Sequence, residues 1–323
     1  MAIQFQNPKE YISEFIGTMI LIAIGCTVGG YGIAYGGSLI IAFGFAAAFI
    51  GLVYCIGKVS DCHFNPLISL SMFINGRMNA QDTAIYVVAQ ILGGIVGAFI
   101  ALFLLAQFDF LGIDKNFVYP SYFGTLSINN IPVYVSAGII GAFVLEMFFA
   151  FILSYIALKA TSERKIDIKA GAIIAFAMFG LIYFGSMASK TAVNPAKSIG
   201  AAFAMTISGV DARFDFLIQL WLFIIAPIIG ALIASFLYMV VESGSFDVNK
   251  FVEDIRAKKE EKAAQKAEAK AAAEAEAAEA SEESADDEPA AEEPVEEVPA
   301  EEEVVISSED PVPEIESIEE NKE

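Results

Sequence analysis

Asn65-Pro66-Leu67 and Asn194-Pro195-Ala196 are two copies of one motif, 129 residues apart in a chain of 323 residues. Each copy follows an apolar, uncharged span and opens a short apolar stretch. Proline is favoured in the first turn of a helix, where its missing N–H would be unpaired in any case. A helix that starts at membrane depth is tolerated where it is buried in protein or lines a cavity. The sequence therefore predicts two re-entrant half-helices, which imply a pore at the middle of a bilayer.

The segments around these motifs predict six transmembrane helices. Glu14 is the one charge from residue 11 to residue 57, and the glycine-rich stretch 29–37 divides this run into two spans. The other four spans are predicted at residues 83–108, 133–158, 170–189 and 216–241, where Glu146 is the one charge. A hydrocarbon layer takes about 20 apolar residues per helix, so each window is long enough to cross it. The first segment, 11–28, is expected to stay in the membrane and not to be a cleaved signal.

The charges divide the chain into a membrane domain and a tail. Residues 1–241 carry 11 acidic and 11 basic side chains, whereas residues 242–323 carry 29 acidic and 8 basic ones. Residues 255–281 are rich in Ala, Glu and Lys and favour a solvated helix. The remainder has too few large apolar residues to fold, which predicts a disordered acidic tail. A specific docking or regulatory role for the tail is the alternative.

The basic residues also predict the orientation, because cytoplasmic loops of membrane proteins are enriched in Lys and Arg. The predicted loops on the side of the N-terminus hold most of them, and the long loop 107–132 on the other side holds one base. Both termini are therefore predicted to be cytoplasmic. The three cysteines lie in or beside spans and are interpreted as small apolar residues, not as a disulfide framework; they are Cys26, Cys55 and Cys62.

The two halves form a repeat of three spans each, residues 11–106 and about 134–241. Glu14 and Glu146 stand early in their halves, and Gln90 and Gln219, again 129 residues apart, open the last span of each. Because three is odd, the halves must enter the membrane from opposite sides, so the repeat is inverted. The predicted fold class is all-α: six transmembrane helices, two re-entrant half-helices whose N-terminal ends meet near the midplane, and a disordered C-terminal tail.

At this level of detail the chain resembles the aquaporin, or major intrinsic protein, family over residues 8–241. The resemblance rests on residues 57–70 and 191–200, which look like the two loop motifs of the family, and on the paired glutamates and glutamines. It implies a multi-pass plasma-membrane channel, a homotetramer with one pore in each subunit, and no cofactor. No catalytic residue, metal site or nucleic-acid partner is expected: the sequence offers no nucleophile–base pair, phosphate loop or metal cluster.

The motifs themselves supply the predicted pore residues. Asn65 and Asn194, at the half-helix N-termini, can donate from their side-chain amides to one passing oxygen, and the positive helix ends oppose cations. The other motif residues start the helices; they are Pro66, Leu67, Pro195 and Ala196. The resemblance implies that Glu14 and Glu146 accept hydrogen bonds from the re-entrant loops, which we favour over a proton relay. For His63, the one histidine, we favour a structural hydrogen bond within its loop over a pH gate.

The resemblance also implies a selectivity filter formed by Phe45, Ile182, Thr191 and Lys197, with Phe43 as an alternative to Phe45. The family usually has Arg where this chain has Lys197, and strict water channels have His where it has Ile182. Lys presents a flexible ammonium where Arg presents a rigid fork, which predicts a looser filter. Other departures from the family pattern bear on pore diameter; they are Asp61, Leu67 and Lys190.

The function predicted on these grounds is passive conduction of water and small neutral solutes down a gradient. A glycerol-type facilitator is the alternative within the same fold, because Ile182 removes a bulky polar group. Against it, Ser198 stands where glycerol facilitators typically carry Asp. An anion channel, with Lys190 and Lys197 as a positive ring, and a membrane anchor that recruits partners through its tail are the alternatives from other classes.

Overall fold

The structure is a computed structural model that describes residues 7–35, 37–107, 120–122, 125–128, 131–135, 137–161, 163–191, 193–208 and 215–243. The chain divides into two units, Met1–Glu253 and Asp254–Glu323, and every described residue belongs to the first. The predicted disordered tail and solvated helix lie outside the described residues.

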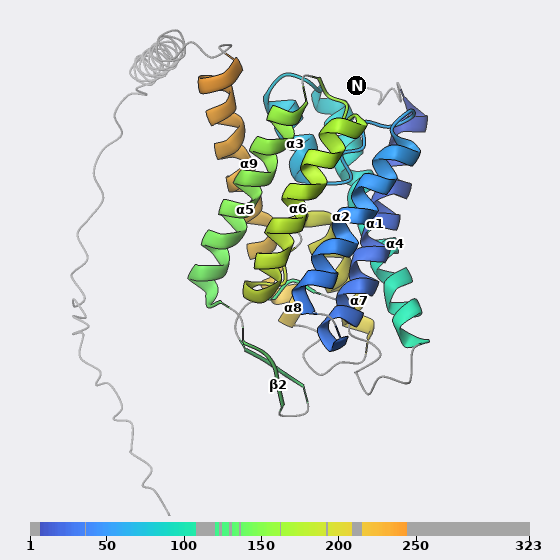
Figure 1. The fold of residues 1–323 in the computed structure, drawn as a ribbon, viewed down its shortest axis with the longest axis vertical. Helices are drawn as coiled ribbons and strands as arrows, with labels where there is room; N and C mark the ends of the chain where they lie inside the picture. The colour runs from blue at the N-terminus through green and yellow to red at the C-terminus, as the bar shows by residue number, and fades with distance from the viewer. Residues whose placement is uncertain are drawn as a thin grey trace, which may run out of the picture. The chain divides into compact units, whose positions relative to one another are not determined.

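Six long apolar helices make up the bundle (Figure 1). The elements of the first half are α1 (Pro8–Tyr35), α2 (Gly37–Ile56), the short α3 (Pro66–Ile74) and α4 (Ala80–Ala106). Those of the second half are α5 (Ile139–Ala160), α6 (Ile168–Ala188), the short α7 (Pro195–Ile207), and α8 (Asp215–Gln219) with α9 (Leu222–Tyr238), which together form the last span; a π-helical turn, Met239–Ser243, follows. The predicted six spans and two half-helices are confirmed.

The packing of the helices is repeated between the halves. In the first half α1 packs on α4 and on α2, and in the second half α5 packs on α9 and on α6. Each half-helix also packs against the last helix of the other half, α7 on α4 and α3 on α9. Figure 1 shows the N-terminus and the end of α9 at one end of the bundle, with α3 nearer that end and α7 nearer the other. The predicted inverted repeat is confirmed.

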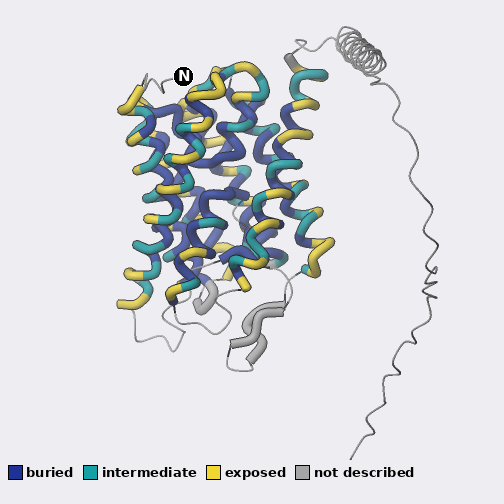
Figure 2. Tube along the Cα trace, turned by 180° about the vertical axis from the view of Figure 1, so that it is seen from behind, coloured by how far each residue is buried: buried dark blue, intermediate teal, exposed yellow. Residues whose placement is uncertain are grey.

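Glycines allow the paired helices to approach until their backbones touch. A β-carbon on Gly97 would lie 2.3 Å from the carbonyl oxygen of Met19, and one on Gly230 would lie 2.0 Å from that of Met147. These are the α4–α1 and α9–α5 contacts. Small residues of this kind let membrane helices pack closely, where hydrophobic exclusion from water contributes little. Buried residues accordingly fill the space between the helices, while exposed ones cover the outside (Figure 2).

The structure differs from the sequence prediction at three places. Helix α1 continues through the glycines at 29, 30 and 32 to Tyr35, since glycine is tolerated in transmembrane helices whose backbone stays hydrogen-bonded. The last span is interrupted between α8 and α9, where Ile225 N donates to Trp221 O at 2.9 Å. The long connection between α4 and α5, predicted as a loop, contains an antiparallel pair, β1 (Thr125–Ile128) and β2 (Ile131–Val135).

Candidate functional site

Asn65 and Asn194 are the N-caps of the two half-helices. The Oδ1 of Asn65 accepts from Leu67 N at 3.0 Å, and the Oδ1 of Asn194 accepts from Ala196 N, also at 3.0 Å. Proline follows each cap in the first turn, where it leaves no extra donor unpaired. Both asparagines are buried, and each uses its oxygen on its own helix, so its amide nitrogen is left to point elsewhere.

The side-chain amide nitrogen of each asparagine donates a hydrogen bond to the other half of the protein. Asn65 Nδ2 donates to Val193 O, and Asn194 Nδ2 donates to Phe64 O, each at 2.9 Å. These carbonyls belong to the residues just before the asparagines, and both residues are left-handed, with φ of 48° at Phe64 and 50° at Val193. Such a backbone costs a non-glycine residue about 1–3 kcal/mol, and here it turns each carbonyl toward the opposite asparagine.

Each amide nitrogen has two N–H groups, and the crossed bond uses one of them. The described residues supply no second acceptor for either amide. The N-terminal ends of α3 and α7 therefore meet, each with one amide N–H available and with the positive end of its helix dipole directed to the meeting point. The two amide N–H groups can therefore donate to the oxygen atom of a molecule that carries no positive charge.

Glu14 of α1 supports the first re-entrant loop directly. Its Oε1 accepts from Ser60 Oγ at 2.5 Å and from His63 N at 3.0 Å, and its Oε2 accepts from Phe64 N at 2.8 Å and from Gln90 Nε2 at 2.9 Å. Four donors match an ionised carboxylate, which can only accept. The buried side chain thus holds the irregular backbone that precedes Asn65.

Glu146 of α5 reaches the second loop through hydroxyl groups. Its Oε1 accepts from Ser189 Oγ and its Oε2 from Thr191 Oγ1, both at 2.6 Å, and Thr191 Oγ1 in turn accepts from Val193 N at 2.9 Å. The first loop repeats this relay, because Ser60 Oγ accepts from Cys62 N at 3.1 Å while donating to Glu14. In both halves, therefore, a buried glutamate and a hydroxyl group together supply hydrogen-bond acceptors to the irregular backbone of the re-entrant loop.

His63 lies in a chain of buried hydrogen bonds that starts at Gln90. Gln90 Nε2 donates to Ser69 Oγ at 2.9 Å, and that oxygen lies 3.0 Å from His63 Nδ1. His63 Nε2 is 2.8 Å from the carbonyl oxygen of Arg164, which can only accept, so Nε2 donates to it. Both ring nitrogens are occupied, which favours a structural role.

Arg164, which sequence reasoning missed, joins three carboxylates at the end of the bundle that holds the N-terminus. Its guanidinium pairs with Asp61 of the first loop, with Glu10 of α1 at 2.6 Å, and with Asp82 of α4 at 3.1 Å. Ile166 N also donates to Asp61 O at 3.0 Å. Burial lowers the pKa of Arg164 while Asp61, Glu10 and Asp82 raise it, and the net direction is up. The α5–α6 connection is thereby fastened to the first re-entrant loop.

The structure brings together some of the predicted filter residues. Thr191 and Lys197 lie on the second loop and its half-helix, and Lys197 Nζ donates at 2.9 Å to the carbonyl oxygen of Lys190, the residue before Thr191. The ring of Phe45 fills the space beside Gly25, next to Cys26, where a β-carbon would lie 2.1 Å from it. Phe43 is 66% exposed, so of the two aromatic candidates Phe45 is the internal one.

Ile182 is fully buried in α6 and belongs to the same apolar core as Phe45. Leu67, another departure from the family pattern, is also buried, in the first turn of α3.

Lys197 is entirely buried, and its ammonium is held by oxygen acceptors. Nζ donates to Lys190 O at 2.9 Å and to Ser121 Oγ at 3.1 Å. The Lys190 ammonium is directed to Ser186 O, at 2.6 Å. Ser121 comes from the connection between α4 and α5, and no sequence pattern marks it. The predicted flexible ammonium is thus fixed at two points by its surroundings.

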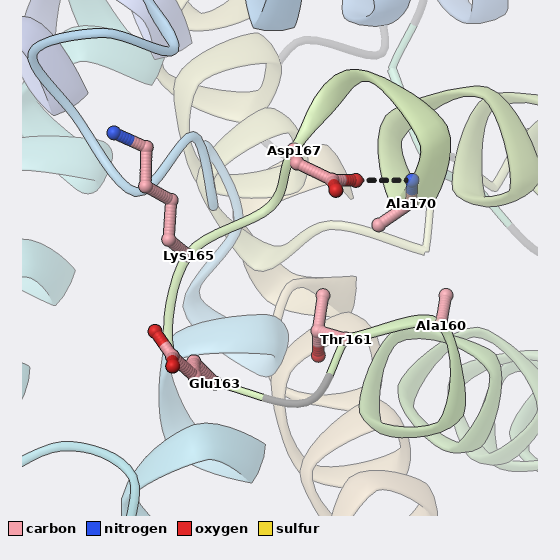
Figure 3. Close-up of a pocket in the computed structure, with 6 residues that line it drawn as sticks. All are labelled: Ala160, Thr161, Glu163, Lys165, Asp167 and Ala170. Atoms are coloured by element: carbon pink, nitrogen blue, oxygen red, sulfur yellow. Dashed lines mark hydrogen bonds between the residues drawn. The ribbon is translucent and has the colours of Figure 1, made fainter.

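A separate cavity of about 230 Å³ lies between the end of α5, the connection that follows it and the start of α6 (Figure 3). Asp167 lines it, but this carboxylate caps α6 by accepting from Ala170 N at 2.8 Å. The remaining lining residues are Ala160, Thr161, Glu163, Lys165 and Ala170. None of the predicted pore residues lines this cavity, so it is distinct from the candidate site.

Comparisons with known proteins agree with this architecture. The sequence profile of the family described as major intrinsic protein matches residues 1–238. The chain is 31% identical over 255 residues to "Probable aquaporin PIP2-7" of Oryza sativa subsp. japonica, which covers 73% of this chain and 80% of that protein. It is 30% identical over 251 residues to "Aquaporin Z" of Rhodopseudomonas palustris, covering 73% and 94% of the two chains.

Another relative carries a different name. "Glycerol uptake facilitator protein-like 6" of Lactiplantibacillus plantarum is 31% identical over 237 residues, covering 73% of this chain and 99% of that protein. The solved structure of the aquaglyceroporin from Plasmodium falciparum superposes with a TM-score of 0.61 at 22% identity, covering 72% of this chain and 96% of that one. At that identity the likeness concerns the fold.

Six spans and two half-helices that meet N-terminus to N-terminus define a multi-pass membrane protein of the channel class. The chain belongs to the major intrinsic protein family, which is made up of channels. The resemblance identified from the two motifs is confirmed.

Proposed function

We propose that the protein is a passive, bidirectional channel for water and small neutral solutes, without a catalytic step. The observation that carries the proposal is the pair of crossed asparagines, Asn65 and Asn194, each with one amide N–H free for a solute oxygen. Two fixed donors orient that oxygen so that its hydrogens do not continue a proton wire. The two positive helix ends at the centre and the Lys197 ammonium in the filter both oppose cations and hydronium.

In this proposal the predicted site residues act in two groups. Asn65 and Asn194 receive the solute at the centre, and Phe45, Ile182, Thr191 and Lys197 form the filter. Support comes from the burial of all four filter residues. Glu14, Glu146 and His63 hold the loops, and Pro66, Leu67, Pro195 and Ala196 form the first turns of the half-helices.

A stopped-flow shrinkage assay on proteoliposomes, with parallel gradients of an impermeant solute, glycerol and urea, tests the function. Fast shrinkage without electrical conductance supports a neutral-solute channel. Conductance that reverses at the chloride potential would support the anion channel instead. No shrinkage, with a partner retained by the tail, would support the membrane anchor.

A glycerol-type facilitator is the second candidate. The apolar Ile182 favours it, because an apolar wall lowers the cost of admitting a carbon backbone. The relatives named as aquaporins and the one named as a glycerol facilitator match at 30–31% identity, so the names do not decide between them. The glycerol arm of the shrinkage assay does.

The further elements of the proposal concern assembly and location. We expect a homotetramer in the plasma membrane, with a channel domain of residues 1–241, an acidic tail of residues 242–323, and both termini in the cytoplasm. Light scattering of the purified protein tests the tetramer. Protease access to a C-terminal tag in sealed, right-side-out membranes tests the orientation, since cleavage from outside would contradict it.

A further inference from the structure

We propose that Ser121 is a specificity-determining positioning residue, whose hydroxyl holds the Lys197 ammonium in the filter. The inference rests on the proposed channel function and adds a residue that comes from outside the two motifs and their half-helices. It also makes the extracytoplasmic connection between α4 and α5 part of the filter.

The Lys197 ammonium donates hydrogen bonds to two different parts of the chain. Lys197 is fully buried, and its two described acceptors are Lys190 O at 2.9 Å and Ser121 Oγ at 3.1 Å. Lys190 O belongs to the same re-entrant loop as Lys197 and moves with it. Ser121 Oγ is therefore an acceptor that ties the ammonium to a different part of the chain.

The hydroxyl of Ser121 is itself held by the second loop and its half-helix. Ser121 Oγ lies 3.1 Å from Ser198 Oγ and 3.4 Å from Lys190 O, so it can accept from the ammonium and donate to one of these oxygens. Ser121 is 5% exposed. The hydroxyl thus contacts three groups, and an apolar side chain there would remove one hydrogen-bond acceptor from the ammonium.

The backbone around Ser121 is anchored independently of its side chain. Tyr122 N donates to Ser189 O at 3.0 Å, and the Tyr122 ring packs edge-on against Phe216 with centroids 5.4 Å apart. At the far end of the same connection, Ala137 N donates to Ala188 O at 2.8 Å. Removing the Ser121 hydroxyl should therefore leave the segment in place and change only what the ammonium meets.

The effect on selectivity follows from the chemistry of lysine. Arg would present a rigid planar fork, whereas Lys ends in a compact ammonium on a flexible stem whose position depends on its acceptors. When Lys190 O and Ser121 Oγ both accept from the Lys197 ammonium, the ammonium is held in one position and the filter opening has one size. With Ser121 Oγ removed, the ammonium can leave that place, and the filter no longer sizes the solute as sharply.

The test measures the ratio of glycerol to water permeability in proteoliposomes of the full-length protein. Losing one hydrogen bond of ordinary net strength changes a population by roughly three- to tenfold, so we expect Ser121→Ala to raise the ratio by about that factor. Ser121→Cys, which keeps the size but accepts weakly, should act in the same direction and covers the case in which the alanine variant does not fold. Ser121→Thr, which retains the hydroxyl, should stay close to wild type.

Two further variants isolate the mechanism. Ser208→Ala is the matched control, because Ser208 is a buried serine of the same membrane half whose described bond is to Met205 O, at 2.9 Å. In a Lys197→Met background, Ser121→Ala should have no further effect on the ratio, because the ammonium that it positions is gone.

An unchanged ratio in both Ser121→Ala and Ser121→Cys would overturn the inference, as would an equal effect of Ser121→Ala with and without Lys197. A fall in water permeability at constant ratio would also overturn it, since that is the mark of a merely structural role. A wild-type protein that passes no water overturns the proposed function and this inference together. Wild-type water flux with an unresponsive ratio overturns this inference alone.

Discussion

Glu14→Gln should be among the most destabilising isosteric changes in this protein. The carboxylate has four donors directed at it, and an amide in its place can accept on one side only. The amide oxygen can keep Ser60 Oγ and His63 N. The new NH₂ group then faces Phe64 N–H and the amide of Gln90.

The cost can be estimated group by group. Gln90 has a buried side-chain oxygen without a hydrogen-bond partner, so it can turn its amide and accept from the new NH₂ group in exchange for its bond to Ser69 Oγ. Phe64 N–H belongs to the backbone and cannot turn to present an acceptor, so it is left unpaired. An unpaired buried donor costs about 1–3 kcal/mol. The bonds that remain lose the charge of their acceptor, which removes about 1 kcal/mol more. The sum is about 2–4 kcal/mol, against a total stability of about 5–15 kcal/mol for a folded domain.

Glu146→Gln provides the internal comparison. Its described partners are two hydroxyl groups, Ser189 Oγ and Thr191 Oγ1, which can rotate and accept as well as donate. We therefore expect a loss of about 1 kcal/mol or less. Glu163→Gln, at an exposed position in the α5–α6 connection, is the control and should lie within about 0.5 kcal/mol of wild type.

The measurement is the free energy of unfolding by denaturant titration in mixed micelles, extrapolated linearly for all three variants. The order of losses should be Glu14→Gln, then Glu146→Gln, then Glu163→Gln. If Glu14→Gln loses no more than Glu146→Gln, backbone donors do not set the cost and the reasoning is refuted.

Three further predictions concern the pore, the helix packing and the tail. Asn194→Asp replaces the donor to Phe64 O by a carboxylate in a dry region, so water flux should fall or a cation leak appear; wild-type behaviour in shrinkage and conductance assays would contradict the pore assignment. Gly94→Ala places a β-carbon 2.3 Å from Ala196 O, so it should cost about 1–3 kcal/mol and reduce flux, while Gly51→Ala, with open space around it, should do neither. Truncation after Lys250 should leave flux per channel unchanged, because the described contacts of Glu242 with Lys159 and Tyr155 are retained; a several-fold rise would show that the tail gates.

Much of this fold could be predicted because the membrane restricts what a chain can do. A span needs a long apolar window, and a polar or proline-led interruption at membrane depth must line a cavity or be buried in protein. The windows and the two motifs at Asn65 and Asn194 therefore predicted the six spans, the half-helices and the inverted repeat. The pairing of Glu14 with backbone donors was inferred from the family resemblance, and the hydroxyl relay through Ser60 and Thr191 was not foreseen.

The contacts that sequence reasoning missed depend on which loops meet in space. Arg164 counts in the sequence as one of several basic residues near a helix end, and only the fold brings Asp61, Glu10 and Asp82 around it. Asp61 had stood out as an unusual residue, which was the available signal. Ser121 lies in a long connection without periodicity, so no pattern could place it beside Lys197. The strand pair was foreseeable, because β-branched residues stand on both sides of Asn129-Asn130 in the sequence.

The crossed bonds between the halves bear on how the chain is made. Asn65 and its acceptor Val193 are 128 residues apart, which at about 5–20 residues per second separates their synthesis by on the order of ten seconds. During that interval the first three transmembrane helices are in the membrane, but the partners of Asn65 Nδ2 and Phe64 O have not yet been synthesised. The first half can therefore complete its structure only after the second half is inserted. A nascent chain that stalls between the halves would keep an unpaired half-helix end for the quality-control machinery to recognise.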